Sequence, residues 1–193
     1  ANPGSAGATV LDVLVRRNTG LTGVDANINL TSYSAFYQPT LTAVVDSNTV
    51  VAGGGSDGLA FKVTGYNYQY GSLTAQVRAN TVTGKSRAGI LASHYGSQPG
   101  PWVTVVAEDN QITGCGYGVK ADGANLVLHR NTITGSSQWG ISCTNANASI
   151  GGSLAQANDV HNNNGLNLYA TGVIVQAAYN YWGTVDEDQL ASW

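Results

Sequence analysis

The stretch Val105-Val106-Ala107-Glu108-Asp109-Asn110-Gln111-Ile112-Thr113-Gly114 contains the pattern that decides the fold. Two apolar residues are separated by one spacer, an Asn stands three positions after the second, and another apolar residue follows two positions beyond the Asn. The part of the pattern that leads to the Asn recurs at positions 18, 48, 80, 110, 131 and 180, and more loosely at Asn158, which makes seven copies. After most copies comes a segment that opens with Gly and an apolar residue, such as Gly89-Ile90. The chain is therefore built from internal repeats.

The apolar residues of each repeat alternate with a period of two, which predicts β-strands rather than helices. Consecutive Asn residues of the pattern are 21 to 32 residues apart, which suits a coil of three short strands joined by turns of variable length. One coil cannot bury its own apolar face, so the coils must stack about 4.8 Å apart with like residues above like. We predict a right-handed parallel β-helix of about seven coils, with an internal hydrogen-bonded ladder of the Asn side chains.

We expect one domain over residues 1–193, with coils at 10–183 and a C-terminal cap at 184–193. Thr184 precedes a run of acidic residues, the arrangement of a helix N-cap and its first turn. No comparable plug precedes Val10. We therefore expect further coils, another domain or another subunit at that end, as in a chain excised from a longer one.

The repeats Asn80-Thr81-Val82-Thr83-Gly84, Asn110-Gln111-Ile112-Thr113-Gly114 and Asn131-Thr132-Ile133-Thr134-Gly135 resemble a known pattern, as does the closing Asn180-Tyr181-Trp182-Gly183. They are similar to the degenerate parallel β-helix repeats of the pectate-lyase-like superfamily, over roughly residues 10 to 183. The resemblance implies the fold, and it implies that a polysaccharide lies along one outer face. It leaves the activity open, because the same fold carries lyases, hydrolases, adhesins and phage spikes.

Composition narrows the classes of partner. Only 10% of the residues are charged, and the eight Lys and Arg residues form no basic cluster, so we expect no nucleic acid partner. No apolar run approaches the roughly 20 residues of a membrane-spanning helix. Low charge with abundant Asn and Thr is typical of exported proteins. We expect a secreted, extracellular or cell-surface protein.

The two cysteines, Cys115 and Cys143, form no metal-binding spacing with each other or with His. The alternation assigns Cys143 to the core and Cys115 to a corner in another column, so we expect no disulfide between them. We predict no metal and no cofactor; calcium stays open as an alternative that the sequence does not support, because the acidic residues are dispersed.

When the coils stack, residues at equivalent positions of successive repeats form columns. One set of outward-facing columns is rich in polar side chains. Counted from the Gly of each second strand, Lys62, Lys120 and Asp122 point outward, and His94 is expected beside them. We expect this face to bind a polysaccharide between aromatic walls, because sugar rings stack on aromatic rings while their hydroxyls bond polar groups. The predicted substrate-binding residues are Tyr66, Tyr68, Tyr70, Tyr95, Trp102, Asn167 and Tyr169.

A second set of columns lies next to the Asn positions. Two residues before each Asn the charges alternate in sign, which predicts a structural ladder of Arg16, Asp46, Arg78, Glu108 and His129. Four residues before each Asn, a stripe of outward apolar side chains is predicted, which a homo-oligomer or a flanking domain would cover. The stripe consists of Leu14, Val44, Val106, Val127 and Leu154 and is interrupted by Gln76. The alternative is that local loops cover this stripe.

Three functions remain open. The first is an exported or cell-surface module that binds glycan or takes part in an adhesin or surface assembly, without a clear catalytic centre. The second is a polysaccharide lyase or glycoside hydrolase acting on the face of Lys62, Lys120 and Asp122, with His94 as a further candidate catalytic residue. The third is a structural subunit of an extracellular filament or trimeric spike. The dispersed carboxylates favour the first and third, because a glycosidase needs two carboxylates about 5–9 Å apart.

Overall fold

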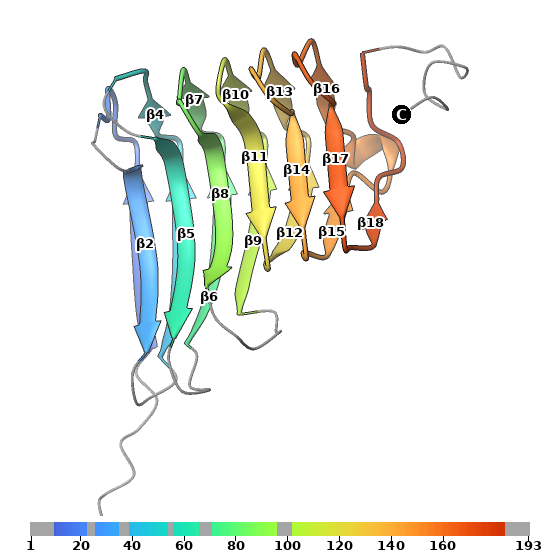
Figure 1. Ribbon diagram of the computed structural model, residues 1–193. Coiled ribbons are helices and arrows are strands. Elements are labelled where there is room, and N and C mark those ends of the chain that lie inside the picture. Colours follow the sequence, from blue (N-terminus) through green and yellow to red (C-terminus); the bar gives the residue numbers. More distant parts are fainter. Residues whose placement is uncertain are drawn as a thin grey trace, which may run out of the picture.

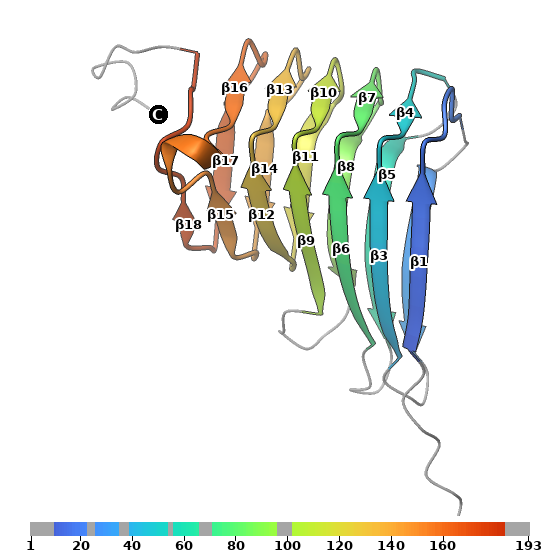
Figure 2. The ribbon, with the colours of Figure 1, turned by 180° about the vertical axis from the view of Figure 1, so that it is seen from behind.

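The computed structural model describes residues 10–22, 26–34, 39–53, 56–65, 71–95 and 102–183. These residues form a parallel β-solenoid with three sheets (Figures 1 and 2). Sheet 1 contains β1 (Val10–Arg16), β3 (Thr40–Asp46), β6 (Ser72–Arg78), β9 (Val103–Glu108), β12 (Asn125–His129), β15 (Ala148–Ile150) and β18 (Val175–Gln176). Sheet 2 contains β4 (Thr49–Val50), β7 (Thr81–Thr83), β10 (Gln111–Thr113), β13 (Thr132–Thr134) and β16 (Asp159–His161). Sheet 3 contains β2 (Ala26–Ser34), β5 (Asp57–Gly65), β8 (Ala88–Tyr95), β11 (Tyr117–Asp122), β14 (Ile141–Thr144) and β17 (Leu168–Thr171).

The chain winds through the three sheets in a fixed order. In Figure 1 it rises along the rear sheet, crosses through sheet 2 and descends along the front sheet while it advances from β2 to β17, which is a right-handed coil (Figures 1 and 2). All strand pairs between successive coils are parallel, for example β6 with β9 and β5 with β8. The predicted fold class is therefore confirmed.

The number of complete coils differs from the prediction. Within the described residues sheet 2 has five strands, so five coils carry a strand in all three sheets, rather than about seven. The first coil touches sheet 2 only through a bridge at Leu21, and the last only through a bridge at Tyr181. Counting Asn residues overestimates the complete coils, because the terminal repeats lack a full set of strands. The predicted cap at 184–193 lies outside the described residues.

The core consists of the inward residues of the alternating pattern. Val103, Val105 and Ala107 of β9 are fully buried, whereas Thr104 and Val106 between them are only partly buried. In sheet 3 Ile90, Val119 and Ile141 stack in register and are fully buried. Because identical faces repeat in every coil, the buried side chains form one continuous apolar column along the axis.

The Asn ladder forms as predicted and joins all seven repeats. The N–H and Nδ2 groups of Asn48 donate to Asn80 Oδ1 at 2.9 and 3.0 Å, and those of Asn80 donate to Asn110 Oδ1 at 3.0 Å each. The same pairing continues from Asn18 to Asn48 and through Asn131 and Asn158 to Asn180. The ladder satisfies buried polar groups at a corner where the strand pairing is interrupted.

Two backbone conformations make the corners. The residue before the ladder Asn has a positive φ in most repeats, for example 56° at Asp109 and 56° at Arg130. In the sixth repeat the 3₁₀ helix η1 (Leu154–Gln156) replaces that turn, and Ala157 has a φ of −55°. The second corner uses Gly114, with a φ of 66°, which explains the Gly four positions after the Asn.

Candidate functional site

The outer face of sheet 3 carries three of the four predicted catalytic candidates. The register aligns Lys62, Ser93 and Asp122 in one row, and it aligns Leu91, Lys120 and Ser142 in the neighbouring row. Lys62, Lys120 and Asp122 are all partly exposed. Two coil spacings of about 4.8 Å separate the backbones of Lys62 and Asp122, so these two groups face the same side without being adjacent.

His94 differs from the prediction. It pairs in register with the fully buried Val63, whereas its neighbour Ser93 pairs with Lys62. Alternation therefore places His94 outside the rows of Lys62 and Lys120. Its ring lies 6.4 Å from the ring of Trp102, and burial lowers the pKa of the His94 imidazole. His94 is a partly buried residue at the end of β8 and not part of the row of cations.

Tyr117, Trp139 and Tyr169 form an aromatic row across three consecutive coils of the same outer face. The ring centroids of Trp139 and Tyr169 are 4.1 Å apart with the planes stacked at 15°. Tyr117 meets Trp139 edge to face at 5.6 Å, and Lys120 Nζ lies 4.9 Å from the centroid of the Tyr117 ring. All three rings are partly exposed, so the row forms a fixed, semi-accessible aromatic surface beside a cation.

The aromatic row was only partly predicted. Tyr169 was among the predicted binding residues, but Tyr117 and Trp139 were not. Each of these two stands directly before the Gly that opens its strand in sheet 3, in the column that also contains Asp57 and Ala88. Reading that column from the sequence would have found them.

Asn167 was predicted to point outward beside Lys120, and this prediction is wrong. Ile141 pairs with Leu168, so Asn167 and not Gly165 is the counterpart of Gly140. Asn167 is buried, donates from Nδ2 to Trp182 O at 2.9 Å and accepts from Asn163 Nδ2 at 2.8 Å. Asn167 therefore lies inside the last complete coil and joins it to Trp182 of the final partial coil. The shift of two residues brings Tyr169 into the row of Lys120 and Ser142 instead of that of Asp122.

The predicted aromatic walls are described only in part. Tyr66, Tyr68 and Tyr70 lie outside the described residues. Tyr95 ends β8 and is half-exposed, whereas Trp102 is partly buried and packs against the core. Trp102 is therefore held more by the interior of the solenoid than by the outer face of sheet 3.

A small apolar patch and an ion pair lie next to the aromatic row. Ala60, Ala88 and Leu91 are buried on the outer face of sheet 3, and Tyr117 packs against them. Asp57, fully buried, accepts two hydrogen bonds from the guanidinium of Arg87, one of them from Nε at 2.8 Å. This contact raises the pKa of Arg87. The pair joins β5 to the turn before β8 and fixes the outer face next to the aromatic row.

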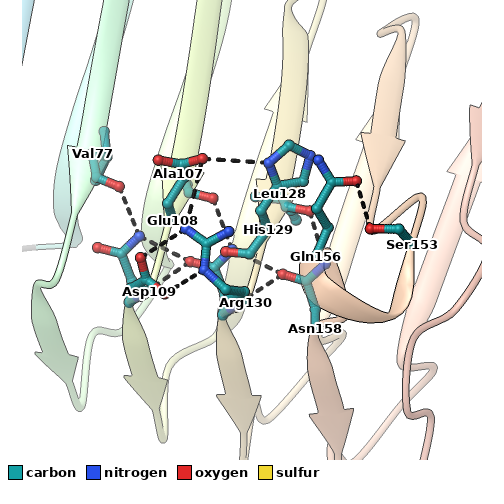
Figure 3. A network of polar contacts seen from close by, with 12 residues as sticks. Val77, Ala107, Glu108, Asp109, Leu128, His129, Arg130, Ser153, Gln156 and Asn158 are labelled. Carbon is teal, nitrogen blue, oxygen red and sulfur yellow. Dashed lines mark hydrogen bonds and ion pairs between the residues drawn. The ribbon is translucent and has the colours of Figure 1, made fainter.

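The outer face of sheet 1 contains the predicted charge ladder in part. Arg16 Nε contacts Asp46 Oδ2 at 2.8 Å, and His129 Nδ1 lies 3.4 Å from Glu108 Oε1. Arg130 contributes a contact that was not predicted, because its Nε donates to Asp109 Oδ1 at 2.7 Å and so lowers the pKa of Asp109 (Figure 3). Figure 3 shows Glu108, Asp109, His129 and Arg130 beside Asn158 of the ladder. These contacts join successive coils, so this face stabilises their stacking.

The predicted apolar stripe is shorter than expected. Val127 pairs with Ser149 in the next coil, and Ser149 with Gln176, so Leu154 does not continue the column but lies in η1. A shallow depression of about 510 Å³ lies at Val127 and is lined in part by Asn147 and Ile174. Whether another chain covers the stripe stays a prediction.

Within the described residues, no group of three or more His, Cys, Asp or Glu could hold a metal ion. Cys115 and Cys143 are buried free thiols, and Cys143 lies in the core as predicted. The described part of the chain contains no helix long and apolar enough to cross a membrane. Comparisons with protein families, with curated proteins and with solved structures found no match to this chain.

Proposed function

We propose that this protein is a glycan-binding β-solenoid of an exported or cell-surface protein, and that the outer face of sheet 3 is its binding surface. The observation that carries this proposal is the aromatic row of Tyr117, Trp139 and Tyr169, with Lys120 beside it. The repeat pattern, which resembles the pectate-lyase-like superfamily, supports the same assignment by analogy.

The row has the chemistry that sugar binding requires. Sugar C–H groups pack on aromatic surface, while sugar hydroxyls and carboxylates bond to charged and polar groups. Lys120 is adjacent to the Tyr117 ring, and Asp122 lies one outward position further along β11. The mutual stacking of Trp139 and Tyr169 holds both rings in place before a ligand binds, which reduces the entropy cost of binding.

The direction of the row favours a polymer over a single sugar. Its members come from β11, the turn before β14, and β17, so the row runs along the solenoid axis. An extended chain that lies along this axis can contact the rings of three successive coils. We therefore infer that the ligand is a linear polysaccharide, with acidic sugars favoured by Lys62 and Lys120.

Binding without cleavage is the better supported alternative. In the row of Asp122 the neighbouring residues are Ser93 and Thr144, so no second carboxylate stands beside it in register. Hydrolysis by the usual pair of carboxylates needs a partner within about 5–9.5 Å. The alternative of a polysaccharide lyase or hydrolase is retained as an outcome of the experiment below.

The experiment screens the purified chain against neutral and acidic polysaccharides by calorimetry, with reducing ends and unsaturated products measured in the same samples. Trp139→Ala should weaken binding by roughly two- to tenfold, since an aromatic contact contributes about 0.5–1.5 kcal/mol beyond area burial and 1.4 kcal/mol is about tenfold. Tyr181→Ala is the matched control, because Tyr181 is an exposed aromatic residue near sheet 2.

Each outcome decides between the alternatives. Binding that Trp139→Ala and Tyr181→Ala weaken equally places the ligand elsewhere. No binding to any polysaccharide refutes the proposal. Product release that is lost in Lys120→Ala or Asp122→Asn, with native circular dichroism retained, supports the enzyme instead.

A further inference from the structure

The end of the solenoid formed by β1 and β2 has an incompletely covered core. Leu11 occupies the same inward column as Leu41, but Leu11 is 57% exposed and Leu41 only 6%. Val13 and Val15 pack on the core and are only partly buried, whereas Val45, which pairs with Val15, is fully buried. The first coil therefore presents an apolar layer of the same kind that every inner coil presents to its neighbour.

The backbone of β1 also has one side without a partner strand among the described residues. In sheet 1 the order of strands begins with β1, which pairs only with β3 among the described strands. Arg17 N–H donates to Asp46 O, so alternation directs the N–H and C=O groups of Asp12, Leu14 and Arg16 to the opposite side. Seven residues of strand thus offer an edge for parallel pairing.

The ladder gives this end chemical specificity. Inside the solenoid each Asn Nδ2 also donates to a carbonyl of the preceding coil, three residues before that coil's Asn. Asn48 Nδ2 donates to Val15 O at 3.1 Å, and Asn110 Nδ2 donates to Val77 O at 2.9 Å. Asn18 Nδ2 donates to Arg16 O of its own strand at 3.2 Å, a contact that Asn80 and Asn131 also make within their own coils. Among the described residues, Asn18 lacks the second contact, to a carbonyl of a preceding coil. Within the described part of the chain, no donor reaches Asn18 Oδ1.

The other end of the ladder is finished differently. Asn180 Nδ2 donates to Ala177 O at 2.9 Å and Ala178 O at 3.2 Å, both in its own coil, as well as to Ile150 O at 2.8 Å. Asn180 Oδ1 accepts from Asn158. The strands of sheet 3 also shorten along the axis, from nine residues in β2 to four in β17. The ladder residue with incomplete side-chain contacts is therefore Asn18, at the end of the solenoid where the strands of sheet 3 are longest.

We propose that the β1–β2 end binds a parallel β-coil of the same repeat type. The chemistry of Asn18 defines this partner. Its strand must carry an Asn whose N–H and Nδ2 donate to Asn18 Oδ1, and a carbonyl three residues earlier that accepts from Asn18 Nδ2. Aliphatic residues at its inward positions cover Leu11, Val13 and Val15. The surface is thus a growth end for further coils and is independent of the glycan-binding face.

The experiment adds such a coil and asks whether it docks. A copy of residues 72–101 replaces residues 1–9, directly before Val10, because Ser72 pairs with Thr40 and Thr40 with Val10. Amide hydrogen exchange of Asp12, Leu14 and Arg16 is measured by NMR, with Val119 as an internal reference for the native solenoid. Docking should slow exchange of the three edge amides roughly tenfold or more relative to the unmodified chain.

Variants within the copied coil test the recognition. Asn80→Ala in the copy should lose most of the added protection, whereas Gln76→Ala, at an exposed outward position, should retain it. Edge amides that exchange as in the unmodified chain, with Val119 still protected, overturn the proposal. Equal protection in the two variants overturns the role of the ladder. If the fusion does not fold, a peptide of residues 72–80 added to the unmodified chain must slow the same amides, and failure to do so is equally decisive.

Discussion

Replacing Asn110 by Ala tests the ladder at its centre. The Asn110 side chain makes four hydrogen bonds: Oδ1 accepts from the N–H and Nδ2 of Asn80, and Nδ2 donates to Val77 O and to Asn131 Oδ1. The backbone N–H of Asn110 also donates to Asn131 Oδ1 at 3.1 Å, and this bond survives the substitution.

The expected loss follows from the groups left without a partner. Asn131 Oδ1 keeps the bond from the Asn110 N–H, and Asn80 Nδ2 keeps its bonds to Val45 O and Arg78 O. The backbone N–H of Asn80 and the carbonyl of Val77 each lose the ladder contact in a buried setting. Val77 O keeps its strand bond to β9, because Arg78 pairs with Glu108 in register, so the Asn80 N–H is the group left unsatisfied. An unsatisfied buried group costs about 1–3 kcal/mol and a lost hydrogen bond about 0.5–1.5 kcal/mol, so we expect Asn110→Ala to lower the free energy of unfolding by about 2–4 kcal/mol.

Urea unfolding followed by far-ultraviolet circular dichroism measures this loss, with Asn18→Ala as the matched control. Among the described residues, the Asn18 side chain donates to Arg16 O and Asn48 Oδ1 alone, and Asn48 Oδ1 keeps the bond from the Asn18 N–H. We expect Asn18→Ala to cost about 1 kcal/mol or less. Equal losses in the two variants would show that the buried ladder contacts do not stabilise the solenoid as reasoned.

Two further predictions concern buried groups. Arg87→Gln should lower the free energy of unfolding by about 3–5 kcal/mol, because it leaves the fully buried Asp57 carboxylate without its cation. Asp57→Asn should cost less, since Arg87 is 41% exposed and can reach water; the opposite order in urea unfolding would contradict the argument. Burial raises the pKa of Cys143 to about 12, so this thiol should resist alkylation in the native chain at about pH 8 and react after unfolding. Mass spectrometry that finds Cys143 alkylated as fast in the native chain as in urea would refute its core position.

The outer faces show where reasoning from the sequence alone reaches its limit. Counting from the nearest Gly gave the correct rows for Lys62, Lys120 and Asp122, since their coils contain that Gly at the expected place. In the last coil Asn167 takes the place of the Gly, and the count was displaced by two residues. His94 was assigned to the outer face although it is in register with Val63. A displacement of one position moves a strand residue to the other face, so such errors are decisive for a site.

The sequence by itself determined the solenoid, the ladder and the core. These features repeat every coil, and a repeated apolar alternation with a recurring Asn has few other ways to bury its groups. Only the tertiary structure decided the number of complete coils, the row of Tyr117, Trp139 and Tyr169, and the pairing of Arg87 with Asp57. Each of these depends on the register between coils whose turns differ in length. That register is set by packing across coils, where residues 21 to 32 positions apart become neighbours.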